Sequence, residues 1–178
     1  MVPRHLREMF SFLLIQVISM AGIPDAHEIV PGIWLGNKRA AENEKWLMEK
    51  NITVVFNATK DIPFSRSIKK QYRIPVDDNL QAEEIRNMTL WSNEAVYKVM
   101  YEHNKNQNIL LHCHAGMQRS AAIMAMYLIA KRGYTSDQSI NYIRGIRPIA
   151  FRPQANFRES INEFEKTYHR EILPNLLR

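Results

Sequence analysis

One short run of the chain carries the clearest chemistry: residues 112 to 120 read HCHAGMQRS. Cys113, the single cysteine of the 178 residues, stands six positions before Arg119 and seven before Ser120. An ionised thiol is a strong nucleophile, and a planar guanidinium grips two oxygens of one phosphoryl group. The spacing therefore predicts nucleophilic attack on a phosphoryl group.

The run lies between a predicted strand, Ile109–Leu111, and a predicted helix, Ser120–Ala130. A loop in that place can turn successive backbone N–H groups inward, and the helix N-terminus adds positive potential at the same point. Gly116 allows the tight turn that such a loop requires. We therefore expect phosphate to be bound by His114, Ala115, Gly116, Met117, Gln118 and Arg119.

Cys113 is predicted to be a nucleophile at neutral pH. Amide dipoles, the helix terminus and Arg119 all favour the thiolate, which lowers the pKa of the thiol below its usual value of about 8.5. The Ser120 hydroxyl is placed to hydrogen-bond the sulfur. The side chain of His112 points to the opposite face of the strand from that of Cys113, so we expect it to orient the loop and not to transfer protons. No histidine or carboxylate accompanies His114 at ligand spacing, which predicts no metal site and no cofactor.

The elements around this run alternate between strand and helix. Ile52–Phe56 is continuously β-branched or aromatic, which is typical of a strand buried on both faces of a sheet. Further strands are expected at Glu28–Val30, Ile33–Leu35 and Tyr72–Ile74, and helices at Arg39–Glu49 and Ala82–Glu102. This order predicts an α/β fold with a central mixed, mainly parallel sheet flanked by helices.

The last third of the chain is predicted to be helical. The helix over Ser120–Ala130 is apolar on all sides and stops at Gly133, a residue suited to a helix C-terminus. Thr135 and Gln138 have the spacing of a capping box, which predicts the start of the next helix. A final amphipathic helix is expected over about Asn156–Tyr168.

Residues 1–24 are predicted to form an extra N-terminal amphipathic helix, separate from a domain over 25–178. Arg4 and Arg7 precede the apolar run Met9–Ile18, which is too short to span a bilayer. We therefore predict no transmembrane span. At helical period an apolar stripe forms from Leu6, Phe10, Leu13, Leu14 and Val17. Docking on the core or on a partner is the leading interpretation, and a membrane-associating helix or a cleaved signal are the alternatives.

Composition narrows the class of protein. With 46% hydrophobic and 24% charged residues, the chain suits one globular domain and is unlike a disordered protein. One cysteine excludes an internal disulfide and a cysteine-rich zinc site. These features favour a reducing compartment, the cytoplasm.

The net charge of +6 is concentrated in residues 119–158, which hold seven basic residues and one acid, Asp137. One interpretation is a positive field that attracts phosphorylated or acidic partners. The other is a set of cations in the last turns of helices. The seven are Arg119, Lys131, Arg132, Arg144, Arg147, Arg152 and Arg158.

The run HCHAGMQRSAA resembles the active-site loop of cysteine-dependent protein tyrosine phosphatases, and specifically of the small dual-specificity branch. Three further segments are similar to that branch: GIWLGNKRAA at 32–41, RIPVDDN at 73–79 and RPIAFRPQANF at 147–157. The resemblance extends over residues 28–168. The length and the N-terminal segment are similar to those of compact viral, poxvirus-type members. The resemblance to the family implies a protein tyrosine phosphatase-like fold, with residues 25–178 as the dual-specificity catalytic domain.

The resemblance also implies a general acid. The family places an aspartate after an I-P-x-x stretch, and that register favours Asp78 over its neighbour Asp77. Such a carboxyl group protonates the leaving oxygen and later accepts a proton from water. Pro153 and Asn156 match a family segment that is expected to support the loop. The expected catalytic residues are thus Cys113, Arg119, Asp78 and Ser120.

The implied activity is metal-independent hydrolysis of phosphotyrosine and phosphoserine or phosphothreonine in proteins, through a phosphocysteine intermediate. The expected partners are phosphorylated proteins. An RNA 5′-phosphatase on the same scaffold and a non-catalytic phosphoprotein-binding pseudophosphatase are the alternatives; Gln118-Arg119-Ser120-Ala121 departs from the Asn-Arg-Thr-Gly typical of the RNA enzymes. Small viral relatives also suggest a homodimer through the N-terminal helix.

Overall fold

A computed structural model of the chain describes residues 22–176, and all structural statements below concern those residues. Five strands form one sheet in the order β1-β2-β5-β3-β4. Strands β1 and β2 pair antiparallel, and every other neighbouring pair is parallel. The predicted mixed, mainly parallel sheet is therefore confirmed. The strands are β1 (Ala26–Val30), β2 (Ile33–Gly36), β3 (Ile52–Asn57), β4 (Lys70–Arg73) and β5 (Asn108–His112).

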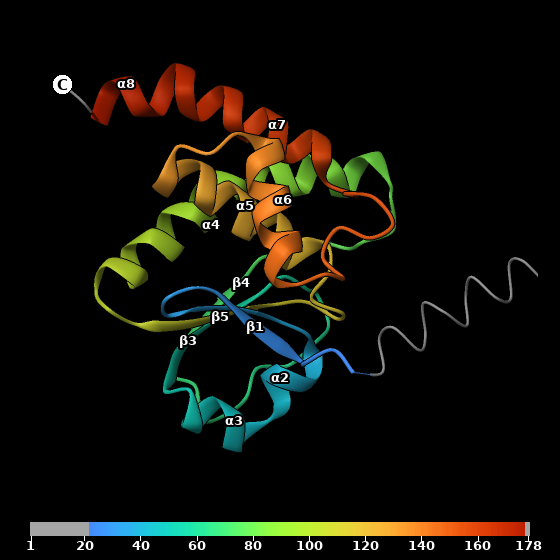
Figure 1. Cartoon of the computed structure of the whole chain (residues 1–178), viewed down its shortest axis with the longest axis vertical. Helices are drawn as coiled ribbons and strands as arrows, with labels where there is room; N and C mark the ends of the chain where they lie inside the picture. Colours follow the sequence, from blue (N-terminus) through green and yellow to red (C-terminus); the bar gives the residue numbers. More distant parts are fainter. Residues whose placement is uncertain (1–21, 177–178) are drawn as a thin grey trace, which may run out of the picture.

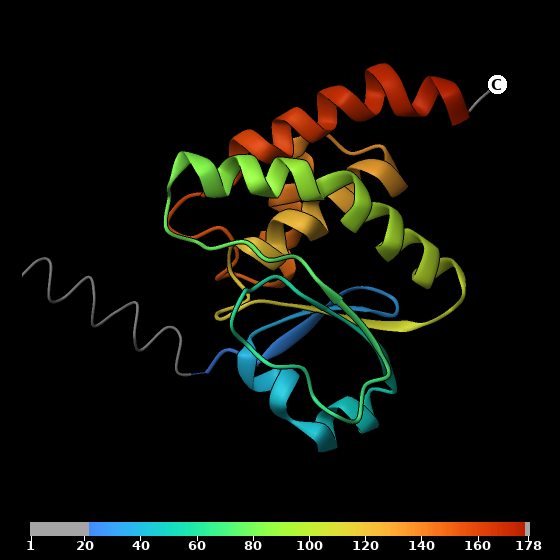
Figure 2. The ribbon, with the colours of Figure 1, turned by 180° about the vertical axis from the view of Figure 1, so that it is seen from behind.

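Helices cover both faces of this sheet (Figure 1). The short helices α2 (Lys38–Glu42) and α3 (Glu44–Glu49) lie on one face. The view from behind shows the longer helices layered on the other face, with the C-terminal helices farthest from the sheet (Figure 2). These are α4 (Ala82–Asn104), α5 (Arg119–Arg132), α6 (Ser136–Ile146) and α7 (Arg158–Thr167), followed by the π-helix η1 (Tyr168–Ile172) and α8 (Leu173–Leu176).

The middle residues of β5 are apolar because the strand serves two cores. Ile109 and Leu111 of β5 face the large core under α4 to α7, while Leu110 between them faces the smaller core under α2 and α3. All three are fully buried. Successive side chains of a strand point to opposite faces, so a strand covered on both sides buries apolar residues on each face.

Several predicted helix ends are confirmed at the level of hydrogen bonds. Gly133 follows α5 in the left-handed conformation, with φ of 66°. Thr135 and Gln138 form a reciprocal capping box: the Gln138 N–H donates to Thr135 Oγ1 at 3.2 Å, and the Thr135 N–H donates to Gln138 Oε1 at 2.9 Å. These caps fix where α5 stops and α6 begins, and α5 is the helix that carries Arg119 and Ser120.

Two predicted helices differ from the structure. The expected helix over 39–49 is two helices, because the Asn43 side chain accepts a hydrogen bond from the Trp46 N–H at 3.0 Å and starts a new helix. The expected helix over 156–168 begins at Arg158 and continues beyond Tyr168 through η1 and α8.

The predicted N-terminal helix lies outside the described residues except for positions 22–24, which are not helical. The homodimer expected through that helix also stays a prediction. Among the described residues, no helix is both long and apolar enough to cross a membrane.

Candidate active site

The loop from Cys113 to Gln118 joins β5 to α5, as the motif predicted. Four successive carbonyl groups of this loop accept hydrogen bonds from groups outside it. The Lys38 N–H binds the carbonyl of His114 at 3.0 Å, and the Phe151 N–H binds that of Met117 at 2.8 Å. Between them, Arg147 binds the carbonyls of Ala115 at 3.2 Å and Gly116 at 2.8 Å.

The outward carbonyls decide where the loop N–H groups point. In a trans peptide group the C=O and N–H bonds point in opposite directions. When a carbonyl of the loop points outward to a hydrogen-bond donor, the N–H of the next residue therefore points into the loop. This applies to the N–H groups of residues 115–118. The N-terminus of α5 adds positive potential at the same point. The loop is thus arranged to bind an anion with three or four oxygens.

Cys113 lies at the base of this loop, with 2% of its surface exposed. Burial raises the pKa of its thiol, but the charge of Arg119, the Ser120 hydroxyl and the N–H groups of Ser120 and Met117 outweigh burial, so the pKa falls below its ordinary value. Ser120 Oγ donates to Cys113 Sγ at 3.3 Å. The structure thereby brings together the predicted nucleophile and the predicted hydroxyl.

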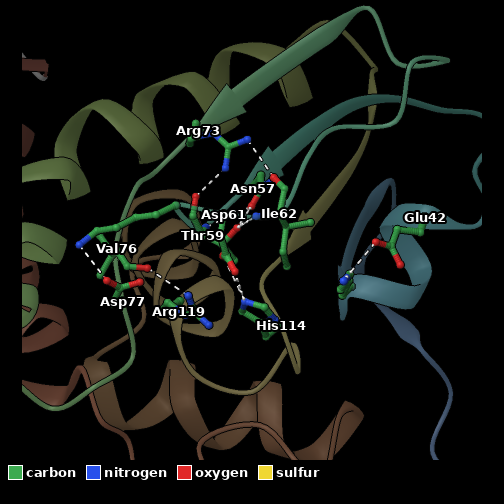
Figure 3. A network of polar contacts seen from close by, with 12 residues as sticks. Glu42, Asn57, Thr59, Asp61, Ile62, Arg73, Val76, Asp77, His114 and Arg119 are labelled. Atoms are coloured by element: carbon green, nitrogen blue, oxygen red, sulfur yellow. Dashed lines mark hydrogen bonds and ion pairs between the residues drawn. The ribbon is translucent and has the colours of Figure 1, made fainter.

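Arg119 is the first residue of α5, and its side chain is 7% exposed. Its Nη1 donates to the Val76 carbonyl at 3.1 Å, while its buried Nε has no hydrogen-bond partner among the described residues (Figure 3). A buried donor without a partner is costly unless a ligand completes it. Through its hydrogen bond to the Val76 carbonyl, Arg119 connects the anion loop to the loop that carries the two candidate acids.

The two candidate acids, Asp77 and Asp78, lie in different surroundings. Asp77 Oδ2 forms an ion pair with Lys60 Nζ at 2.9 Å, and the same ammonium group contacts Glu84. Asp78 is exposed and makes one side-chain hydrogen bond, which Oδ1 accepts from Asn156 Nδ2 at 2.8 Å. A carboxyl group that must carry a proton is poorly placed inside an ion pair, so the contacts favour Asp78, as the register did.

Gln118, expected to contribute its backbone, also uses its side chain to connect the anion loop to Asn156. Its Nε2 donates to the carbonyls of Arg152 and Gln154 at 3.0 and 2.8 Å, and its Oε1 accepts from the Asn156 N–H at 3.0 Å. The segment behind the loop thus holds both the loop and, through Asn156, the carboxyl group of Asp78.

At the rim of the loop, His114 faces an aspartate that the sequence analysis did not single out. Its Nε2 lies 3.2 Å from both carboxylate oxygens of Asp61, and both side chains are exposed (Figure 3). Asp61 comes from the loop between β3 and β4, which is far from His114 in sequence. Its own backbone N–H, and then His114 and Arg119, hold the pKa of Asp61 below its usual range. The pair places one anionic side chain at the mouth of the site.

His112 occupies the last position of β5 and is fully buried. Neither ring nitrogen has a hydrogen-bond partner among the described residues. Burial, together with the charges of Arg73, His114 and Arg119, lowers the pKa of His112 to about 4. A neutral imidazole with no access to solvent is unsuited to proton exchange, and the orienting of the loop by His112 stays a prediction.

The seven basic residues of 119–158 do not all lie on the surface. Arg119 lies in the site, Arg147 is fully buried behind it, and Arg158 is paired with Asp137. Arg147 was expected either as part of a positive field or as a cation in the last turn of a helix, and its contact with the loop was missed. The signal for that contact was its place at the start of the segment 147–157, which resembles a family segment expected to support the loop.

Two histidines outside the motif lie partly inside the fold. His27 is half-buried, and its Nδ1 accepts from Arg147 Nη1 at 2.9 Å. His103 is also half-buried and is hydrogen-bonded to the Tyr127 hydroxyl at 2.6 Å. No group of three or more His, Cys, Asp or Glu side chains within 22–176 is arranged to hold a metal ion.

Comparison with known proteins places these residues in a family. Residues 33–167 match the family model for the dual specificity phosphatase catalytic domain. Mouse dual specificity phosphatase 28 is 28% identical over 160 residues, which cover 88% of this chain and 94% of that protein. Human dual specificity protein phosphatase 1 is 30% identical over 139 residues, which cover 78% of this chain and 36% of the longer human protein.

The fold agrees with solved structures as well. The crystal structure of human dual specificity phosphatase 28 superposes with a TM-score of 0.72 at 22% identity, covering 82% of this chain and 96% of that one. The sheet order and the helical layers are therefore those of a known architecture.

Proposed function

The chain belongs to the dual specificity phosphatase family, and we propose that Cys113 is the nucleophile with which this phosphatase hydrolyses phosphotyrosine and phosphoserine or phosphothreonine in proteins. The observation that carries the proposal is the arrangement at the base of the loop. Cys113 Sγ accepts from Ser120 Oγ, directly below the inward N–H groups of residues 115–118. A phosphoryl group seated on those N–H groups faces the sulfur.

In the first step, Cys113 Sγ attacks phosphorus and the bond to the substrate oxygen breaks. Arg119 and the loop N–H groups bind the three non-bridging oxygens, on which negative charge gathers. Asp78 donates its proton to the departing oxygen, which leaves as the alcohol or phenol. The result is a phosphocysteine and an ionised Asp78.

In the second step, water attacks the phosphorus of the phosphocysteine and the bond to sulfur breaks. Asp78, now ionised, accepts the proton of that water. The thiolate leaves, and the Ser120 hydroxyl stabilises its charge through the hydrogen bond seen in the structure. Phosphate then departs, and each group regains its starting state. All proton and phosphoryl transfers use side chains of this protein.

Asp78 is placed to carry that proton on one particular oxygen. Asn156 Nδ2 is a donor only, so it occupies Oδ1 of Asp78 and leaves Oδ2 for the proton. The Val76 carbonyl, bound to Arg119, holds the start of the same loop against the anion site.

One experiment tests the proposal. The wild-type protein and Cys113→Ser are assayed on a phosphotyrosine peptide, a phosphothreonine peptide and a 5′-triphosphate RNA, without added divalent metal. We expect release of phosphate from both peptides and a loss of about a thousandfold or more in Cys113→Ser, because the reacting atom is removed. A phosphoenzyme should be trapped by acid quenching only in the wild type.

Outcomes that would contradict it are equally clear. Equal activity of Cys113→Ser, or release from RNA alone, would remove the phosphoprotein assignment. Binding of both peptides without turnover would favour the pseudophosphatase. The family match favours neither alternative.

The proposal extends to location. Cys113 must stay reduced to act, and thiolates of lowered pKa are readily oxidised. A reducing compartment, the cytoplasm, suits this requirement.

A further inference from the structure

Behind the anion loop lies an arginine for which the reaction as described has no use. Arg147 follows α6 as its C-cap, and its side chain is completely buried. No carboxylate of the described residues lies within ion-pair distance of it. A buried charge without a counter-ion is expensive, so its retention calls for a reason.

Its guanidinium is satisfied by carbonyl and imidazole acceptors. Nε and Nη2 donate to the carbonyls of Gly116 and Ala115, while Nη1 donates to the Pro24 carbonyl at 3.0 Å and to His27 Nδ1 at 2.9 Å. Two edges of one rigid plane therefore contact two different regions of the chain. One is the anion loop, and the other is the segment that leads into β1.

The contact with the loop fixes two adjacent peptide groups. Holding the carbonyls of Ala115 and Gly116 outward turns the N–H groups of Gly116 and Met117 inward. The Met117 N–H is one of the groups that lower the pKa of Cys113. At Gly116, with φ of 64°, a Cβ would stand 2.4 Å from the Gly36 carbonyl oxygen and 3.0 Å from Arg147 Nη2. The loop has no space to relax toward the arginine.

The charge of Arg147 has the sign that a thiolate needs. Burial lowers the pKa of Arg147 to about 10, and the negative charges of Cys113 and Asp25 oppose that lowering. The guanidinium thus stays protonated at neutral pH. His27 accepts through an unprotonated nitrogen, and burial followed by the Arg147 charge keeps the pKa of His27 below its usual value, which preserves the acceptor.

Arg144 provides an internal comparison. It stands on the same helix one turn earlier and is half-buried, and it also donates to carbonyl groups, those of Ala150 and Phe151. It makes no hydrogen bond to residues 113–118 among the described contacts. The two arginines share residue type, helix and acceptor chemistry, and they differ in which backbone they hold.

We propose that Arg147 is a positioning residue of the phosphatase reaction: through the Ala115 and Gly116 carbonyls it directs loop N–H groups at the phosphoryl oxygens, and its charge stabilises the Cys113 thiolate from behind. The inference rests on the proposed function, since it assigns Arg147 to the same site. Pro24 and His27 hold the other edge of the guanidinium and so connect the start of β1 to the anion loop.

The test uses readouts that need no turnover. Because Cys113 is the single cysteine of the chain, the rate of alkylation by iodoacetamide against pH reports its pKa alone. Binding of inorganic phosphate reports the N–H groups. Both are measured for the full-length wild type, Arg147→Met, Arg147→Lys and the matched control Arg144→Met, with thermal unfolding of each protein recorded in parallel.

We expect Arg147→Met to raise the alkylation midpoint by about one pH unit and to weaken phosphate binding roughly tenfold. Arg147→Lys keeps a charge but lacks the planar fork, so its midpoint should stay nearer the wild type while phosphate binding still weakens. Arg144→Met should change both far less than Arg147→Met, because Arg144 reaches the loop only through Phe151, whose N–H donates to the Met117 carbonyl. If Arg147→Met does not fold, the Arg147→Lys result decides.

The inference would be overturned if a folded Arg147→Met kept the alkylation midpoint and the phosphate affinity of the wild type. If Arg147→Met does not fold, the same result in Arg147→Lys would overturn it. Equal changes in Arg144→Met would overturn it too, because the effect would then be general to this helix. Failure of the proposed function looks different: peptide turnover would be independent of Cys113, whatever Arg147 does to the thiol.

Discussion

The nucleophile side and the acid side of the site are held in opposite ways. Cys113 is buried at the end of a central strand, and the four loop carbonyls that follow it are fixed by Lys38 at the start of α2 and by Arg147 and Phe151 in the segment after α6. Asp78 stands exposed on a loop, and a single side-chain hydrogen bond from Asn156 fixes its carboxyl group.

The difference follows from what each group must do. A thiolate and a cradle of N–H groups act best when they are preorganised, because donors that must reorient lose their advantage at the moment of reaction. A general acid must give up a proton and take another from water in each cycle, which requires contact with solvent and with a changing leaving group. Dense packing suits the first task, and a lightly held exposed loop suits the second.

The largest effect is expected from removing the carboxyl group of the proposed acid. Asp78→Ala should slow hydrolysis of an alkyl or unactivated aryl phosphate by about a hundredfold or more, since the leaving oxygen is no longer protonated. An ester with an acidic leaving group needs no such proton and should slow far less. The ratio of kcat for the two substrates measures the effect.

Asp77→Ala is the matched control for that experiment, because it removes the neighbouring carboxylate of the same loop. Asp77 is engaged with Lys60, so its loss should affect thermal stability more than the leaving-group ratio. A collapse of the ratio in Asp77→Ala instead of Asp78→Ala would reverse the assignment.

A smaller effect is expected on the nucleophile side from Ser120→Ala. The variant removes a hydrogen bond that favours the thiolate, so the pKa of Cys113 should rise. Thiolate forms as pH increases, and the acid limb of kcat/KM should therefore move to higher pH. Phosphocysteine hydrolysis should also slow, by roughly threefold to tenfold, because the leaving thiolate loses its donor.

Rapid quenching measures that second step, since a slower breakdown raises the trapped phosphoenzyme fraction at steady state. An unchanged acid limb together with an unchanged phosphoenzyme fraction would show that the contact between Ser120 and Cys113 has no part in catalysis.

The smallest effect is expected from removing the side chain that holds the Asp78 carboxyl group. Asn156→Ala frees the carboxyl group of Asp78 without removing it, so kcat on the unactivated ester should fall by only a few-fold. The activated ester should be unaffected. Thermal unfolding serves as the control for the packing of the segment behind the loop. A loss as large as that of Asp78→Ala would mean that the acid loop is far less independent than its exposure suggests.

Local patterns predicted much of the fold and of the site. The strand before Cys113 and the helix after it follow from hydrophobic runs, and the ends of α5 and α6 follow from Gly133 and Thr135, whose effects are carried by near neighbours in sequence. The split between α2 and α3 was missed because Asn43 can sit inside a helix or cap one, and the choice depends on packing.

The contacts that hold the site residues in place could not be predicted in the same way. Asp61 meets His114, Asn156 meets Asp78, and Arg147 meets Ala115 and Gly116, each across a sequence separation that no local pattern spans. Arg144 lies inside α6 and Arg147 is its C-cap, and only the path of the chain places the Arg147 guanidinium against the anion loop.

The sequence by itself determined the proposed chemistry, since the spacing of Cys113, Arg119 and Ser120 between a strand and a helix predicts an anion loop with a nucleophile at its base. Only the tertiary structure decided how that loop is held. The positions of its carbonyl partners, and the different surroundings of Asp77 and Asp78, depend on distant segments packing around the sheet, and such contacts follow from the burial of apolar surface across the whole domain.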